Sequence, residues 1–222
     1  MISRIGVPEI PSPLFYNISL SCAKFIRSIM LKIIFNFLLR FHGWTVDPVV
    51  PKETQHCVMI AAPHTSNWDF YYMKLAFYVL DVPMKFTVKR EWTRFPFGIF
   101  MNPLGAVGVD RRPKVPGEKR KSLVDAMVGI IKSRDRIAMV IPPEGTRSLR
   151  KEWKIGFYYT AVKANVPITC GYLDFKNKRA GVAPFAVFPT GDIKKDLQPI
   201  NEFYKDMKGK FPEKFSLDER YV

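Results

Sequence analysis

Residues 137–147 read Ile137-Ala-Met-Val-Ile141-Pro-Pro-Glu144-Gly-Thr-Arg147. The five consecutive apolar residues predict a strand that is buried on both faces, as strands of parallel sheets are. Two prolines end this strand, and a glycine turn that carries Glu, Thr and Arg follows directly. Because ligands bind at the carboxyl ends of such strands, this polar turn is a candidate site in an α/β domain.

The segments on either side of this stretch alternate between the two kinds of structure. Together they favour one α/β domain with a mostly parallel or mixed central sheet flanked by helices. We expect residues 43–55 to be a connector and the charged tail from Lys194 to be a solvated helix. Further strands are predicted at 56–62, 84–88, 106–109, 166–172 and 183–188, and helices at 68–80, 118–133 and 156–164.

The composition points to an anionic partner. The 222 residues carry a formal net charge of +15, and most of the excess falls between residues 84 and 154. Nucleic acid, an anionic membrane surface and a phosphate-bearing substrate all remain open on this ground. The three cysteines and three histidines lack zinc-type spacing, so we expect no metal site and no disulfide framework, which suits a reducing compartment.

The N-terminal region is membrane-like. Residues 14–41 are dense in Phe, Ile and Leu, and their polar residues recur every three or four positions, which places them on one narrow helical stripe. We therefore expect an amphipathic, membrane-associating segment at residues 1–43, formed by two helices or a kinked one, before an α/β domain at 44–222. The alternative is a helix packed on the protein's own core. The stripe consists of Asn17, Ser21, Lys24, Ser28, Lys32, Asn36 and Arg40.

The first chemical motif is a histidine followed five positions later by an aspartate, His64 and Asp69. The histidine follows a predicted strand, and the aspartate stands near the start of a predicted helix. The carboxylate can orient the imidazole, which then takes a proton from a substrate hydroxyl or amine. Taken alone, the same spacing more often marks a helix cap beside a loop histidine.

Three basic motifs follow predicted strands. Arg147 stands on the glycine turn quoted above, where its guanidinium can bind an oxyanion. Arg111 and Arg112 follow a strand, and Lys89 opens a basic, aromatic stretch that ends at Gly98. Each motif by itself is also compatible with a solvated loop or a tight turn with a surface ion pair.

In their order and spacing, these motifs together resemble the glycerolipid acyltransferase family, whose best-known members are 1-acyl-glycerol-3-phosphate acyltransferases. The resemblance covers roughly residues 57–172. Two positions depart from the family pattern, since proline precedes both the histidine and the third block. The family blocks match at His64 and Asp69, at Lys89, Glu91, Pro96 and Gly98, at Val109-Asp110-Arg111, at Pro143–Arg147 and at Val166-Pro167-Ile168.

The resemblance implies transfer of a fatty acyl group from acyl-CoA or acyl carrier protein to the hydroxyl of a lysophospholipid, above all 1-acyl-glycerol-3-phosphate, in phospholipid biosynthesis. It implies that His64 is the general base and that Asp69 orients it. No cofactor is implied, because the acyl donor is a substrate. The substrate-binding residues implied are Lys89, Arg111, Glu144, Gly145, Thr146 and Arg147.

The resemblance also implies a protein held on the cytoplasmic face of a membrane without spanning it. Its partners would be membrane lipids, the lysophospholipid acceptor and the acyl donor, and no nucleic acid is expected. Two alternatives stay open. One is an acyltransferase for another lysolipid, such as an amino-acid-based one. The other is a non-enzymatic basic protein that binds membranes or nucleic acid.

Overall fold

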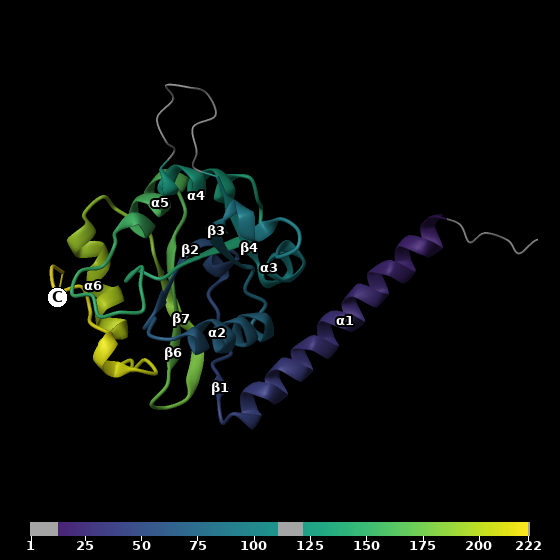
Figure 1. The fold of residues 1–222 in the computed structure, drawn as a ribbon, viewed down its shortest axis with the longest axis horizontal. Helices are drawn as coiled ribbons and strands as arrows, with labels where there is room; N and C mark the ends of the chain where they lie inside the picture. Colours follow the sequence, from purple (N-terminus) through teal and green to yellow (C-terminus); the bar gives the residue numbers. More distant parts are fainter. Residues whose placement is uncertain (1–12, 111–121, 222) are drawn as a thin grey trace, which may run out of the picture.

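The computed structural model describes residues 13–110 and 122–221. Its centre is a seven-stranded sheet in the order β1-β7-β6-β2-β5-β3-β4 (Figure 1). Neighbouring strands run parallel except for the β6–β7 pair, which is antiparallel. The predicted mostly parallel or mixed α/β sheet is thereby confirmed. The strands are β1 (Thr45–Val46), β2 (His56–Ala62), β3 (Met84–Lys89), β4 (Ala106–Val109), β5 (Ile137–Ile141), β6 (Ile168–Asp174) and β7 (Arg179–Val187).

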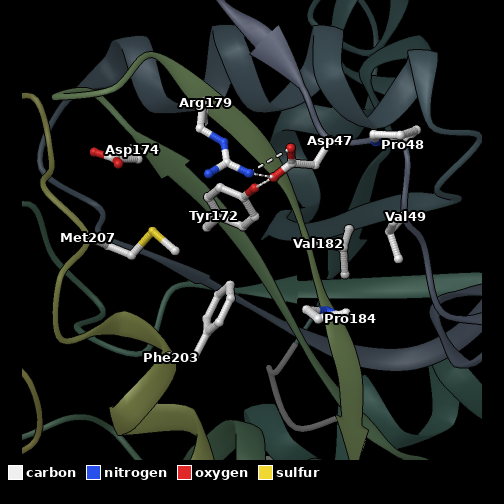
Figure 2. Close-up of a pocket in the computed structure, with 10 residues that line it drawn as sticks. All are labelled: Asp47, Pro48, Val49, Tyr172, Asp174, Arg179, Val182, Pro184, Phe203 and Met207. Carbon is white, nitrogen blue, oxygen red and sulfur yellow. Dashed lines mark hydrogen bonds and ion pairs between the residues drawn. The ribbon is translucent and has the colours of Figure 1, made fainter.

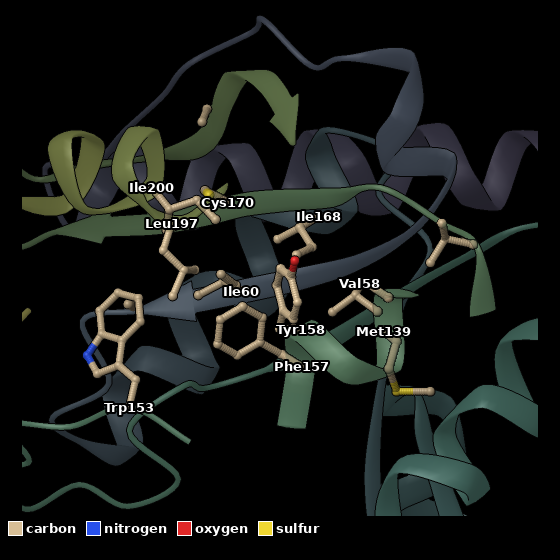
Figure 3. Close-up of a cluster of buried hydrophobic side chains, with 14 of the residues drawn as sticks. Val58, Ile60, Met139, Trp153, Phe157, Tyr158, Ile168, Cys170, Leu197 and Ile200 are labelled. Atoms are coloured by element: carbon tan, nitrogen blue, oxygen red, sulfur yellow. The ribbon is translucent and has the colours of Figure 1, made fainter. Parts of the chain in front are cut away.

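Helices cover both faces of this sheet, and the alternation of side chains along β2 shows how. Cys57, Met59 and Ala61 pack in a cluster with α2 and the end of α1. The intervening residues of β2 point the other way, into a cluster with α4, α5 and α6 (Figure 3). Short 3₁₀ turns lie at 52–55, 90–93 and 212–214. The helices are α1 (Pro13–Phe41), α2 (Asn67–Val79), α3 (Gly98–Leu104), α4 (Leu123–Lys132), α5 (Gly156–Ala164) and α6 (Ile193–Tyr204).

The N-terminal helix is one element, so the expectation of two helices or a kinked one is wrong. At about 1.5 Å per residue, its 29 residues extend over about 44 Å. Figure 1 shows α1 leaving the body beside α2. Leu39 is fully buried, and the Phe35 ring meets Tyr78 edge-on at 4.9 Å. Most other apolar side chains described on this helix are exposed, namely Phe25, Ile26, Ile29, Met30, Ile33, Ile34, Phe37 and Phe41.

The last helix, α6, corrects a second expectation. The charged tail was expected to be solvated, but Leu197, Ile200 and Tyr204 are fully buried. Spacings of three and four residues bring these side chains to one face of the helix, which closes the core. The Tyr204 hydroxyl donates a 2.9 Å hydrogen bond to the carbonyl of Gly171 in β6. The helix is therefore amphipathic: its lysines are exposed, while the buried Asp196 accepts a 2.7 Å hydrogen bond from the Tyr158 hydroxyl.

The sheet edge at β1 is a further difference from the sequence predictions. The helix α3 is another, since no helix is predicted at residues 98–104. Residues 45–46 were expected in a connector, but they pair with β7, which begins at Arg179 rather than at Ala183. Beside this edge is a cavity of about 340 Å³, whose polar groups are paired (Figure 2). The Arg179 guanidinium lies 2.9 and 2.8 Å from the two carboxylate oxygens of Asp47, and the Tyr172 hydroxyl also donates to Asp47.

Candidate active site

The loop between β2 and α2 presents His64 and holds Asp69. Asp69 stands in the first turn of α2, where a carboxylate interacts favourably with the free N–H groups of the helix. One carboxylate oxygen accepts from the backbone N–H groups of Thr65, at 2.6 Å, and Ser66, at 2.7 Å. The Ser66 hydroxyl donates to the other oxygen at 2.7 Å. Asp69 therefore has a fixed position.

The imidazole of His64 contacts this fixed carboxylate. Its Nδ1 lies 3.3 Å from Oδ2 of Asp69, which is almost completely buried. Burial by itself would raise the pKa of Asp69, but hydrogen bonds from His64, Ser66 and Thr65 outweigh it and lower the pKa. An ionised carboxylate at Nδ1 favours the tautomer with its proton there and leaves Nε2 able to accept a proton. The carboxylate that caps α2 is thus also the one that contacts the imidazole.

Glu144 holds the backbone of the histidine. The strands β2 and β5 are parallel neighbours, with Ile60 opposite Ile141, so the loops that follow them meet at one edge of the sheet. Glu144 Oε1 accepts a 2.9 Å hydrogen bond from the backbone N–H of His64. Among the described residues, the buried Oε2 has no hydrogen-bond partner. Its observed contact is with the protein backbone, and a contact with substrate stays a prediction.

The environment of Glu144 opposes its negative charge. Its side chain is 1% exposed. Burial raises the pKa of Glu144 to about 8, and the charge of Asp69 adds to the rise, while hydrogen bonds from the backbone of Glu144 and His64 reduce it. At neutral pH, Glu144 is therefore mainly a neutral acid beside an ionised Asp69.

A cavity of about 840 Å³ opens in front of the histidine. His64, Asp69, Gly145 and Arg147 line it together, so four of the predicted site residues meet in one place. The rest of the lining is mainly apolar and can cover a hydrocarbon chain beside the imidazole. The larger apolar side chains of this lining are Phe70, Met73, Met84, Phe86, Met101, Leu123, Met127, Val140, Ile141 and Phe157.

The other predicted site residues have different positions. Thr146 is on the same turn but is not among the residues that line the cavity, and its hydroxyl accepts from the N–H of Ser148 at 3.3 Å. Lys89 ends β3 and is exposed, also outside the lining. Arg111 lies outside the described residues.

Lys154 is a cavity residue that the sequence analysis missed. It lines the cavity together with Arg147, which gives the cavity two cationic side chains. Gly145 has a φ of +62°, and a Cβ atom placed on it would lie 2.9 Å from Lys154 Nζ. The glycine therefore admits both the turn and the lysine that lies over it. A lysine in a generally basic stretch has no motif to identify it.

The C-terminal segment also supports the histidine loop, again without a sequence signal. The N–H of Phe211 donates to the Thr65 hydroxyl at 3.3 Å. A Cβ atom on Gly209 would lie 2.7 Å from Cγ2 of Thr65 and 3.1 Å from Cβ of Pro63. Only glycine allows this close approach, which joins residues more than 140 positions apart.

Comparison with known families identifies the chain. The family model described as Acyltransferase matches residues 45–172, which is more than half of the sequence and includes both loops of the site. The chain belongs to the acyltransferase family. The resemblance seen in the sequence motifs is confirmed, and the protein is an acyltransferase enzyme.

Two further comparisons concern individual proteins. This acyltransferase is similar to the 1-acyl-sn-glycerophosphate (LPA) acyltransferase PlsC from Thermotoga maritima, whose crystal structure matches with a TM-score of 0.49 and 15% sequence identity. The match covers 79% of the present chain and 75% of that protein. The comparison with curated proteins gives no significant match.

Proposed function

We propose that this acyltransferase moves a fatty acyl group from a thioester donor to the free hydroxyl of a lysophospholipid. The observation that carries the proposal is the contact of His64 with Asp69, 3.3 Å from Nδ1 to Oδ2, on the wall of a largely apolar cavity. A base, its orienting carboxylate, two cations and an apolar space together suit an amphiphilic, anionic acceptor and a long-chain donor.

The proposed reaction is a single displacement. Nε2 of His64 takes the proton of the acceptor hydroxyl as its oxygen attacks the thioester carbonyl. The new C–O bond forms, the C–S bond breaks, and the imidazolium returns its proton to the departing thiolate. Asp69 keeps its charge and stabilises the imidazolium. Because the base acts directly on the acceptor, no acyl-enzyme intermediate is needed.

The preferred acceptor is 1-acyl-glycerol-3-phosphate. Arg147 and Lys154 line the same cavity as the base, and a phosphate monoester is the strongest anion that a lysolipid can offer them. The donor would be acyl-CoA or acyl carrier protein, with its acyl chain along the methionine and phenylalanine side chains of the cavity. Phospholipid biosynthesis is the setting that this chemistry suits.

Membrane association is part of the proposal. The exposed apolar side chains of α1 suit insertion of this helix into the interface of an anionic bilayer, on the cytoplasmic face and without spanning it. In the part of the chain that the structure describes, no helix combines the length and hydropathy needed to cross a bilayer.

The central test is an acyl-transfer assay in mixed micelles with acyl-CoA and acyl carrier protein donors. Lysophosphatidate is compared with phosphate-free lysolipids, including amino-acid-based ones. We expect His64→Ala to lower transfer by about 10²–10⁴-fold. His56→Gln is the matched control, since His56 lies outside the cavity and contacts the carbonyl of Ile131. Full activity of His64→Ala would overturn the role of the base.

A second variant tests the acceptor. If the acceptor carries a phosphate, Arg147→Ala should raise its KM by about tenfold or more, because a contact between charged groups is lost, while the KM for the donor changes less. Transfer confined to phosphate-free acceptors would reject 1-acyl-glycerol-3-phosphate and retain the His64 mechanism. Absence of transfer to every acceptor by folded protein would reject the proposed reaction.

A further inference from the structure

A second groove lies beside the catalytic cavity. It has a volume of about 720 Å³ and is formed by one face from each of α1, α2 and α3. Spacings of three, four and seven residues on α1 and α2 bring these side chains to one face of each helix. The lining consists of Arg27, Ser28, Leu31 and Phe35 on α1, Asn67, Phe70, Tyr71, Lys74, Leu75 and Tyr78 on α2, and Ile99, Phe100, Pro103 and Leu104 on α3.

The groove is mainly apolar and opens among exposed apolar side chains. Ile99 and Phe100 of α3 line it and are 61% and 73% exposed. On the other side, exposed apolar residues continue along α1, among them Ile34 and Met30. Exposed apolar surface of this extent indicates a binding site for hydrocarbon. A lipid in the groove would continue the apolar environment that a bilayer gives to α1 and α3.

Two cations within this apolar lining specify the charge of the occupant. Arg27 and Lys74 both line the groove, and neither has a carboxylate partner among the described residues. Burial lowers the pKa of Lys74, and the positive charge of Lys85 lowers it further. An unpaired, partly buried ammonium group is unfavourable, and an anionic group placed beside it would remove that cost.

We propose that the groove between α1, α2 and α3 binds an anionic phospholipid from the bilayer, with its phosphate on Lys74 and Arg27 and an acyl chain along Leu31, Phe35 and Phe100. This lipid is not the acceptor of the reaction, because its anionic group binds cations other than Arg147 and Lys154. The site therefore does not depend on the acceptor proposed above.

The groove is next to the catalytic cavity. Asn67 and Phe70 line both spaces, and Asn67 is three residues from His64. A phospholipid in the groove thus lies against the wall that separates it from the active site and fixes α1 on α2. The bound lipid would keep the catalytic cavity at the depth in the bilayer from which the acceptor lysolipid enters it.

The test measures retained lipid rather than acyl transfer, so it remains valid if the proposed reaction is wrong. Full-length protein is released from micelles containing phosphatidylglycerol or phosphatidylcholine and examined by native mass spectrometry. We expect one retained phosphatidylglycerol in preference to phosphatidylcholine. Lys74→Gln with Arg27→Gln should lower retention about tenfold or more, since two contacts to a charged group are lost. Arg147→Gln is the control and should retain the lipid.

Two further measurements locate the lipid. Ser28→Trp places a large side chain in the groove and should abolish retention, while thermal unfolding verifies that the variant is folded. A phosphatidylglycerol with a photoreactive acyl chain should cross-link to peptides from α1 and α3. Cross-links confined to residues 123–157 of the catalytic cavity would overturn the proposal. Equal retention of both lipids, unchanged by the Lys74 and Arg27 substitutions, would overturn it as well.

Discussion

The backbone N–H of His64 donates a 2.9 Å hydrogen bond to Oε1 of Glu144, eighty positions further along the chain. This bond joins the two loops that the family motifs occupy, and it runs through the main chain of the histidine rather than through its ring. Asp69 orients the imidazole and Glu144 holds the backbone that carries it. The position of the proposed base is therefore set by two carboxyl groups, one neutral and one ionised.

Substitution of Glu144 by Gln tests this difference in charge. The folded pKa of Glu144 is raised from the ordinary 4.5 to about 8, so the neutral acid stabilises the fold fully below about pH 4.5 and this contribution is lost as pH rises to about 8. Glu144→Gln keeps a hydrogen-bond acceptor and does not titrate. Its Tm relative to the wild type should therefore rise by at least about 2–4 °C between about pH 5 and about pH 8.

Activity provides the second measurement for this position. At neutral pH, Glu144→Gln should keep most of the acyl-transfer rate, whereas Glu144→Leu, which cannot accept the His64 N–H, should lose it. If the difference in Tm between Glu144→Gln and the wild type is the same at every pH, the raised pKa of Glu144 is wrong.

Substitution of Asp69 by Asn should affect both catalysis and stability. The neutral amide no longer stabilises the imidazolium and can donate to Nδ1, which favours the unproductive tautomer. We expect kcat to fall by about 10²–10⁴-fold. Weaker hydrogen bonds from Thr65 and Ser66 should lower the free energy of unfolding by about 1–2 kcal/mol. Steady-state kinetics and urea unfolding measure the two effects, and a normal kcat would show that Asp69 is only a helix cap.

Gly209→Val should disturb the active site from the opposite end of the chain. A side chain at Gly209 meets Thr65 and Pro63 within about 3 Å, so the histidine loop must move. A displacement of about 1 Å is sufficient for a loss of about 10²-fold in rate. Gly129→Ala is the matched control, because no atom lies within 4 Å of its Cβ position on α4. It should keep full activity and stabilise the protein by about 0.5–1 kcal/mol.

Leu197→Ala tests whether α6 belongs to the core. Leu197 is fully buried against the sheet, so its truncation should lower the free energy of unfolding by about 2–5 kcal/mol. A change of less than about 0.5 kcal/mol, measured by urea unfolding with an unchanged m value, is expected only of a solvated helix and would contradict the structure.

The elements that sequence predicted best have the simplest patterns. β2 and β5 are continuous apolar runs, and both were predicted with the bounds that the structure shows. Their parallel pairing then brings His64 and Glu144 to one edge, as expected for loops at the carboxyl ends of strands. His64 and Arg147 could be selected because each stands in a motif at such an end.

The elements that were missed depend on long-range contacts or mixed patterns. The buried positions of α6 alternate with lysines and carboxylates, so the charges concealed a regular apolar spacing. α3 is only seven residues long, contains Pro103 and is enclosed by glycines, all of which favour a loop. Gly209 and Lys154 reach the site only through tertiary packing. No local pattern identifies residues of this kind.

The strand that precedes the proposed base, β2, is the fourth of the seven in the sheet and contributes side chains to both hydrophobic clusters. Fraying of the molecule from either edge must remove three strands before it reaches β2. The amide hydrogens of this strand should therefore exchange with solvent only when the whole domain opens. Local opening at either edge of the sheet therefore leaves the strand before His64 in place, and loss of that strand amounts to loss of the fold.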